Sequence, residues 1–372
     1  VTAVASGGLG FNHLQKGSIY AWWALIMCLL PMFTGGYSDR YGYKKTVAIA
    51  ILITAAGYVL MGTQTSYPAF FSASMLVAIG SAVFKPGLQG IIAHSTDKKT
   101  GPLGWSVFYM IVNIGGFVGP LITGFMRVLP WNYVFFLSAA IHLLNLLFLL
   151  GFKEPVGDRQ KQTTTRSFIS EFFFIFWNSI RNLFEPRLIA FLVIFSGFWL
   201  MFNQRFDLLP NFITDWVDSS VIYGFLGNLF HSQTLIQNAK LGVNLPAEWL
   251  INLDAFSIIL FMIVIGWLFG KIKAIPAIII GIIIASIGVA VAGMTMSGWI
   301  CIFGIFVFSI GEMIASPRKN EYLASIAPPG KKGLYMGYVM FPNAIGWSIG
   351  SKIGGYVYQH HGDKLTLAQH YL

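Results

Sequence analysis

Two of the charged residues that lie inside long apolar stretches of this 372-residue chain are Lys85 and Glu312. Lys85 stands within residues 68–93 and Glu312 within residues 298–316, and each stretch is long enough to cross a bilayer as a helix. A charge in hydrocarbon is costly, so both residues are functional candidates. At about 1.5 Å per residue, each lies roughly 6–8 Å from the middle of its stretch. A zwitterionic ligand could offer its carboxylate to Lys85 and its ammonium to Glu312. Alternatively, each charge has a structural partner or lines a water-filled passage.

Three further side chains within apolar stretches could complete such a site. Asn113 can donate and accept hydrogen bonds at once, which suits a carboxylate or a peptide carbonyl, although helix packing explains it as well. Tyr109 and Trp199 could form the walls of an amphipathic site. Packing is the usual role of aromatic residues in membrane helices, and it is the alternative for both.

Asp254 is a third charged residue that could belong to the site, and it lies near the outer end of its apolar stretch. Arg205 and Lys352 are expected at similar outer depths, so a salt bridge among the three could close the site. The alternative is that these charges reach the outer water by snorkelling.

The sequence lacks the residue patterns that indicate an enzyme. No nucleophile, base and orienting group are arranged for catalysis. Lys331 and Lys332 follow Gly330 without the serine, threonine or glycine spacing of a phosphate-binding loop. Cys28 and Cys301 are far apart, which indicates neither a disulfide framework nor a thiolate metal site. We therefore expect no enzyme activity, no cofactor and no metal.

The composition places these residues in a membrane protein. Apolar residues make up 56% of the chain and charged residues 10%, whereas soluble domains are about 25% charged. The net charge of +10 resides in short basic clusters between apolar stretches, and it forms no polar basic face, so we expect no nucleic-acid partner. The lipid bilayer is the expected environment, and the cell membrane is the expected location.

Apolar stretches of about 20 residues predict membrane-spanning helices. The fold class is therefore an all-α membrane protein of two helical bundles, with ten full spans. The predicted spans cover residues 17–36, 44–63, 68–93, 102–127, 131–151, 188–210, 247–269, 274–294, 298–316 and 333–358.

The connections between these spans indicate the orientation and the domain organisation. Most basic residues fall in alternate connections, which the positive-inside rule places in the cytoplasm. The long connection 211–246 is then outside. The longest cytoplasmic connection is polar in its first half, so we expect an N-terminal bundle over residues 1–151, a linker over 152–187 and a C-terminal bundle over 188–372.

The turn after the first predicted span, residues 35–45, combines glycines, an aspartate and basic residues. Glycines allow two helices to approach, and Asp39 can meet the positive end of a neighbouring helix. This turn resembles the signature loop of the major facilitator superfamily, which follows that family's second helix. The resemblance implies that most of the first helix and the whole twelfth helix are missing. It also implies a conformational role for the matching residues Gly36, Asp39, Arg40, Gly42 and Lys44.

Three other stretches are similar to one branch of that superfamily, the proton-coupled oligopeptide transporters. Residues 80–87 contain Phe-Lys-Pro, as in that branch's fourth helix, and residues 108–115 match its fifth-helix pattern Phe-Tyr-x-x-(Ile/Val)-Asn-x-Gly. Residues 311–328 resemble its tenth helix and the following loop. The chain departs from the branch at Asn203, where a glutamate is usual, and at Asp254, where an asparagine is usual.

The resemblance implies proton-coupled symport of di- or tripeptides or similar zwitterions by alternating access. Glu312 would then carry the coupled proton, and the partners would be a peptide-like small molecule and protons. The substrate-binding candidates are Lys85, Asn113, Glu312, Trp199, Tyr109, Asn203 and Asp254. Two alternatives are a transport-inactive accessory protein that partners other membrane subunits, and a transporter of another organic anion.

Overall fold

The computed structural model describes residues 9, 11, 13–126, 129–151 and 168–362. In these residues the regular elements are helices, with one isolated parallel bridge between Asp218 and Ser297. The contacts divide the chain into two compact units. Unit 1 comprises Val1–Gly101, Gly119–Ile194 and Leu323–Ala344, and unit 2 comprises Pro102–Val118, Phe195–Tyr322 and Ile345–Leu372.

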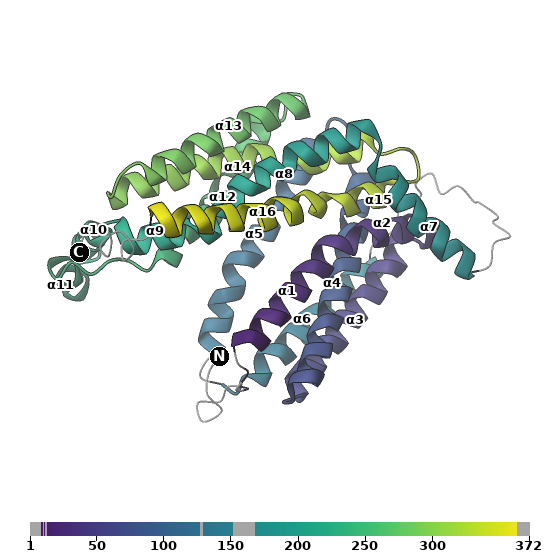
Figure 1. Ribbon diagram of the computed structural model, residues 1–372, viewed down its shortest axis with the longest axis horizontal. Helices are drawn as coiled ribbons and strands as arrows, with labels where there is room; N and C mark the ends of the chain where they lie inside the picture. Colours follow the sequence, from purple (N-terminus) through teal and green to yellow (C-terminus); the bar gives the residue numbers. More distant parts are fainter. Residues whose placement is uncertain (1–8, 10, 12, 127–128, 152–167, 363–372) are drawn as a thin grey trace. The chain divides into compact units, whose positions relative to one another are not determined.

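Unit 1 is built around two long antiparallel neighbours, α3 and α4 (Figure 1). α3 also packs against α6, α4 packs against α1 and α2, and α15 packs against α2 and α4. A Cβ atom added to Gly80 of α4 would lie 2.2 Å from Thr54 Oγ1 of α3, so the missing side chain permits the close approach. The helices are α1 (His13–Leu29), α2 (Pro31–Tyr41), α3 (Tyr43–Thr63), α4 (Tyr67–Ser95), α6 (Asn132–Gly151), α7 (Phe168–Leu183) and α15 (Lys332–Gly337).

Unit 2 contains the remaining helices, several of which have a segment in unit 1 as well. α13 and α14 lie side by side (Figure 1), and their contact is formed by small residues, because a Cβ atom on Gly288 or Gly304 would lie 2.2 or 2.3 Å from backbone of the facing helix. The helices are α5 (Gly101–Phe125), α8 (Pro186–Asp207), α9 (Leu209–Trp216), α10 (Ser220–Leu229), α11 (Gln233–Lys240), α12 (Ala247–Phe269), α13 (Ala274–Gly293), α14 (Gly298–Ile326) and α16 (Phe341–His361).

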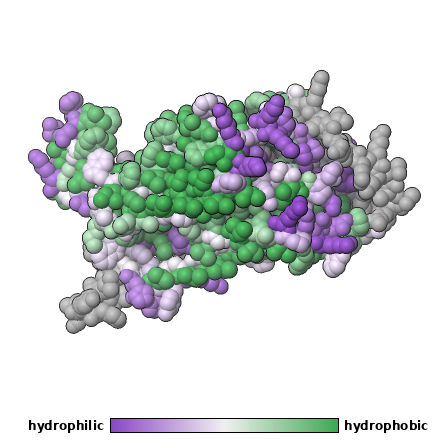
Figure 2. Space-filling view, turned by 90° about the horizontal axis from the view of Figure 1, so that it is seen from above, coloured by the Kyte–Doolittle hydropathy of each residue, from purple (hydrophilic) through white to green (hydrophobic). Residues whose placement is uncertain are grey.

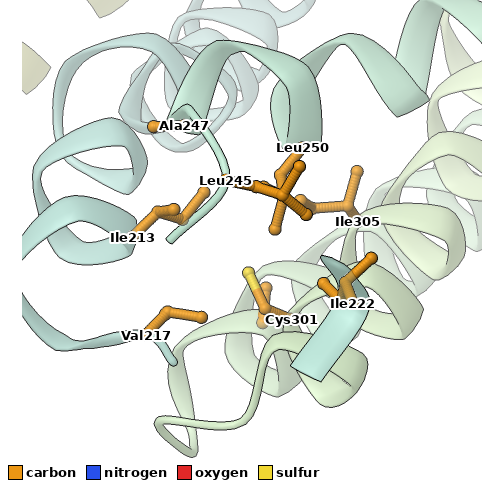
Figure 3. Packing of buried hydrophobic residues seen from close by; sticks show 9 residues of the cluster. Ile213, Val217, Ile222, Leu245, Ala247, Leu250, Cys301 and Ile305 are labelled. Atoms are coloured by element: carbon orange, nitrogen blue, oxygen red, sulfur yellow. The ribbon is translucent and has the colours of Figure 1, made fainter. Parts of the chain in front are cut away.

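The long connection predicted outside the membrane is part of unit 2 and contains most of α9 and the whole of α10 and α11. Its apolar side chains form a buried cluster with residues of α12 and α14. Figure 3 shows Ile213, Leu245, Leu250 and Cys301 of this cluster directed toward a common interior. Burial of this apolar surface holds the segment in a defined place beside the spans.

Eight helices in the described residues are long and apolar enough to cross a membrane. They correspond to eight of the ten predicted spans. The other two are helical but divided: Pro31 begins α2 after a turn at Leu30, and the 3₁₀ turn η3 (Tyr338–Met340) separates α15 from α16. Proline has no backbone N–H to continue the helical ladder, which explains the first division. On the face shown in Figure 2, hydrophobic residues form a broad continuous area with hydrophilic residues beside it.

The structure corrects the predicted end of the ninth span. The sequence predicts a cytoplasmic connection from residue 317 onward, yet α14 stays helical through Pro317 and ends at Ile326. Arg318 and Lys319 are therefore helical residues, and both are buried. Arg318 is neutralised by an ion pair with Glu321 at 2.5 Å and donates a hydrogen bond to the Phe269 carbonyl.

The first half of the predicted linker, residues 152–167, lies outside the described residues. Its second half forms α7, which packs against α2 within unit 1. The division into bundles at residues 151 and 188 stays a prediction, because the two contact-defined units each combine segments from both sides of that boundary.

Candidate functional site

Three charged side chains meet in unit 2. Arg205 of α8 forms an ion pair with Asp254 of α12, and its Nη1 lies 3.4 Å from Glu312 Oε2 of α14. All three are buried, with exposed fractions of 7% for Arg205 and 2% for each carboxylate residue. With both carboxylates ionised, the cluster carries one positive and two negative charges. We call these three residues the buried charge cluster.

Hydroxyl groups complete the hydrogen bonding of the two carboxylates. The Tyr109 hydroxyl of α5 donates to Glu312 Oε1, and Ser309 Oγ lies 2.6 Å from Asp254 Oδ1. Asn113 Nδ2 donates to the Tyr109 carbonyl at 2.9 Å, which is one helical turn away. Tyr109, Asp254 and Glu312, three of the predicted site residues, are therefore brought together by α5, α12 and α14.

Aromatic rings surround the guanidinium of the buried charge cluster. The Arg205 Cζ atom lies 4.5 Å from the ring centroid of Phe206, 4.9 Å from Phe202 and 5.1 Å from Phe308. These rings stabilise the cation and keep water away from it. Electrostatic interactions within the cluster are therefore stronger than they would be in water.

Arg205 and Asp254 are not at the outer water, which was one of two interpretations of their positions in the sequence. Snorkelling to outer water is wrong for Arg205 and Asp254, because both side chains are buried and paired. The salt bridge that the sequence allowed does form, but Glu312 is its third member, while Lys352 is exposed. The predicted ligand-binding residues do not include Arg205. Its position two residues after Asn203, where the resembled branch usually has a glutamate, is the sequence signal that could have indicated it.

Two other predicted site residues lie on α8 in the same unit. Trp199 is partly buried, and the Lys319 ammonium lies 4.5 Å from its ring centroid. Asn203 has an exposed fraction of 3%. Their predicted contact with substrate stays a prediction.

Lys85 belongs to α4 in unit 1, whereas the buried charge cluster belongs to unit 2. Among the residues that the structure describes, no carboxylate forms an ion pair with Lys85. The predicted bridging of Lys85 and Glu312 by one ligand therefore stays a prediction. In the described part of the chain, no group of three or more His, Cys, Asp or Glu residues could hold a metal ion.

Asp39, in the predicted signature loop, lies against the first turn of α15. Asp39 Oδ1 accepts a hydrogen bond from Gly333 N at 2.7 Å, and Oδ2 accepts one from Leu334 N at 2.8 Å. The Tyr43 hydroxyl donates to the same carboxylate. Asp39 thus meets the positive end of a neighbouring helix, as its residue type and position indicated.

Glycines allow this contact between α2 and α15. A Cβ atom on Gly35 would lie 2.1 Å from Gly333 O, and one on Gly337 would lie 2.1 Å from Pro31 O. Gly36, the glycine predicted from the motif, lies nearest to α7: a Cβ atom there would be 2.9 Å from Ile175 Cγ2 and 3.8 Å from Leu334 Cδ1 of α15. Gly42 joins α2 to α3 with a φ of 101°, a conformation that favours glycine.

Other basic residues of the motif and of the α15 region lie at or beside helix ends in unit 1. Arg40 is in the last turn of α2 and Lys44 in the first turn of α3. Lys332 Nζ donates to the Ala93 carbonyl near the end of α4 at 2.9 Å, and Lys331 Nζ donates to Asn182 Oδ1 at 3.2 Å. α15 is therefore tied by hydrogen bonds to α2, α4 and α7. We use the name α2–α15 contact for the packing of α15 against α2 together with these hydrogen bonds to α2, α4 and α7.

The pH dependence of this contact follows from Asp39, which lies outside the predicted spans. Burial raises the pKa of Asp39 from 3.8 to about 7, despite the hydrogen bonds that lower it. When α15 moves away, the carboxyl is hydrated and its pKa falls toward the ordinary value. Asp39 therefore binds its proton more tightly when the α2–α15 contact is closed than when it is open. Lowering the pH from 8 to 6 should accordingly strengthen the closed contact.

We expect amide hydrogen exchange in residues 332–340 of the wild type, corrected for intrinsic rates, to be slower at pH 6 than at pH 8. Asp39→Asn should remove this pH dependence and slow the transport cycle while leaving ligand affinity largely intact. Asp97→Asn, at an exposed carboxylate in the next predicted cytoplasmic connection, is the matched control. An equal loss of ligand binding in Asp39→Asn would contradict a purely conformational role.

Comparison with known proteins agrees with this architecture. A family model described as Major Facilitator Superfamily matches residues 2–351. Multidrug resistance protein MdtH of Proteus mirabilis (strain HI4320) is 22% identical over 351 residues, covering 94% of this chain and 79% of that protein.

Solved structures show the same fold. A variant of the E. coli fucose:proton symporter FucP has a TM-score of 0.71 at 12% identity, covering 95% of this chain and 86% of that one. A variant of a peptide transporter POT in complex with alafosfalin has a TM-score of 0.59 at 19% identity, covering 95% and 82%. These likenesses do not distinguish the oligopeptide branch from others. Since the family model covers most of its length, this multi-pass membrane protein belongs to the major facilitator superfamily.

Proposed function

We propose that this secondary transporter moves zwitterionic small molecules, with di- and tripeptides as the first candidates, together with protons by alternating access. Membership of the superfamily supports transport and not enzyme activity. The coupling ion, the substrate class and the site residues are the proposed part.

The observation that carries the proposal is the charge balance of the buried charge cluster. Arg205 compensates only one of the two carboxylates, and the cluster is buried among aromatic rings. An uncompensated buried charge is costly. A proton or the ammonium group of a ligand restores neutrality, which suits a protein that couples the two.

Glu312 is the carboxylate that can exchange its partner. Arg205 is held closely by Asp254, whereas its Nη1 is 3.4 Å from Glu312 Oε2. The Tyr109 hydroxyl supplies the other contact to Glu312 and can stay in place when the carboxylate is protonated. We therefore assign the coupled proton to Glu312 and the permanent ion pair to Arg205 and Asp254.

The α2–α15 contact supports alternating access. It joins residues that the sequence assigns to opposite bundles, and it combines hydrogen bonds to backbone at helix ends with close packing at Gly35 and Gly337. The sequence predicts Lys85 of unit 1 as a partner of the ligand carboxylate, and the proposed function does not depend on which basic residue takes that role.

The test is uptake of radiolabelled dialanine into proteoliposomes with an imposed proton gradient. We expect the wild type to accumulate dialanine, and Glu312→Gln to lose accumulation and show a flattened pH dependence while retaining exchange of substrate across the membrane. Asp97→Asn should behave as the wild type. Uptake that ignores the proton gradient in the wild type would contradict proton coupling.

A second candidate is export of organic cations, because the relative MdtH is named a multidrug resistance protein and the buried charge cluster combines net negative charge with aromatic rings. Competition separates the two. Amphipathic cations that compete better than zwitterions would favour export. Absence of any transport would favour the accessory-protein alternative.

A further inference from the structure

One face of α14 carries both an acid and a base inside unit 2. Glu312, Ser316 and Lys319 are four and three residues apart, so they follow one another along the same face of a helix. All three are buried, with exposed fractions of 2%, 2% and 5%. α14 remains helical through Pro317, so this spacing is maintained.

The base end of this face has several polar groups. The Lys319 ammonium lies 4.5 Å from the ring centroid of Trp199 on α8. Trp199 Nε1 and Asn320 Oδ1 are buried and have no hydrogen-bond partner among the described residues. Asn320 itself has an exposed fraction of 5%. A buried donor and a buried acceptor without partners are costly, so they indicate groups that a ligand satisfies when it binds.

These groups match the carboxyl end of a peptide. A carboxylate accepts hydrogen bonds from the lysine ammonium and from an indole N–H, and an amide oxygen accepts one from a peptide N–H. At the other end of the face, the buried charge cluster lacks one positive charge, which a peptide ammonium supplies.

The separation of the two ends selects a peptide length. Seven residues of helix extend about 10 Å, and both side chains lean toward the helix N-terminus, so the charges keep about that separation. An extended chain spans about 3.3–3.6 Å per residue, so three residues cover the distance and two do not.

We propose that Glu312 and Lys319 bind the amino and carboxyl ends of one extended tripeptide along α14, with Trp199 and Asn320 contacting its carboxyl-terminal residue. This inference rests on the proposed function and adds a length preference to it. It also assigns the carboxylate to Lys319 of unit 2 and not to Lys85 of unit 1.

The experiment measures binding of dialanine, trialanine, tetraalanine and trialanine amide to purified protein by isothermal titration calorimetry. We expect the wild type to bind trialanine about tenfold or more tightly than trialanine amide, as expected for one charged hydrogen-bonding partner. It should also prefer trialanine to dialanine and tetraalanine. Lys319→Met should remove both preferences, and Lys319→Arg should retain them.

Lys271→Met is the matched control, because Lys271 also lies over a tryptophan ring, 5.7 Å from the Trp267 centroid, but both residues are exposed. It should leave all four affinities unchanged. Trp199→Phe keeps an aromatic ring but removes the indole N–H together with the second ring of the indole, so it should weaken trialanine more than its amide. This variant keeps the test decisive if Lys319→Met does not fold.

The outcomes separate this inference from the proposed function. Wild-type binding of peptides without a length preference, or an equal loss for trialanine and its amide in Lys319→Met, would overturn the inference alone. Loss of the carboxylate preference in Lys85→Ala but not in Lys319→Met would also overturn it. Failure of the wild type to bind any of the four peptides would overturn both.

Discussion

Arg205→Met should lower the free energy of unfolding by about 3–5 kcal/mol, because it leaves two buried carboxylates without their cation. Arg205 pairs with Asp254 and approaches Glu312, and both partners are 2% exposed. Methionine fills a similar space, so lost packing contributes little. Chemical denaturation of the purified protein in detergent, followed by tryptophan fluorescence, measures the change.

The double variant Arg205→Met with Asp254→Asn should recover much of this loss, since it removes one carboxylate together with the cation. Lys352→Met, at an exposed position of α16, should change stability by less than about 0.5 kcal/mol. Equal stability of the wild type and Arg205→Met would show that the buried charge cluster does not form. A double variant as unstable as the single one would argue against ionised carboxylates.

Gly35→Ala should lower the rate of transport by about tenfold or more while leaving substrate affinity unchanged. The added Cβ would lie 2.1 Å from the Gly333 carbonyl oxygen, and that backbone cannot move without separating α2 from α15. Overpacking of a well-packed contact costs about 1–3 kcal/mol, and about 1.4 kcal/mol corresponds to tenfold in an equilibrium. Initial uptake rates and equilibrium binding, measured on the same preparation, separate the two effects.

Gly355→Ala is the matched control, because a Cβ atom there would meet nothing within 4 Å. Both glycines lie in helices, so any general effect of alanine on helix stability is the same. Normal uptake by Gly35→Ala would mean that the α2–α15 contact is not part of the transport cycle. Loss of binding in Gly35→Ala would place this contact in the folding of the site.

The sequence by itself determined the membrane class, eight of the spans and the family. Each of these depends on local properties: a run of about 20 apolar residues predicts a span wherever its neighbours lie. The signature loop is also local, and the helix-end contact of Asp39 followed from its charge and position. Local pattern failed where the apolar run stopped before the helix did, as at Arg318 and Lys319.

Only the tertiary structure decided which charges neutralise one another. Arg205 and Glu312 are 107 positions apart, and Ser309 and Asp254 are 55 apart, so no local spacing pairs them. The structure also decided that Gly35, and not Gly36, makes the close backbone contact with α15. The physical reason is that a buried charge is neutralised by whichever side chain the packing of distant helices brings within a few ångströms. The same packing decides which glycine lies at a helix crossing, and the hydropathy of the sequence does not indicate either outcome.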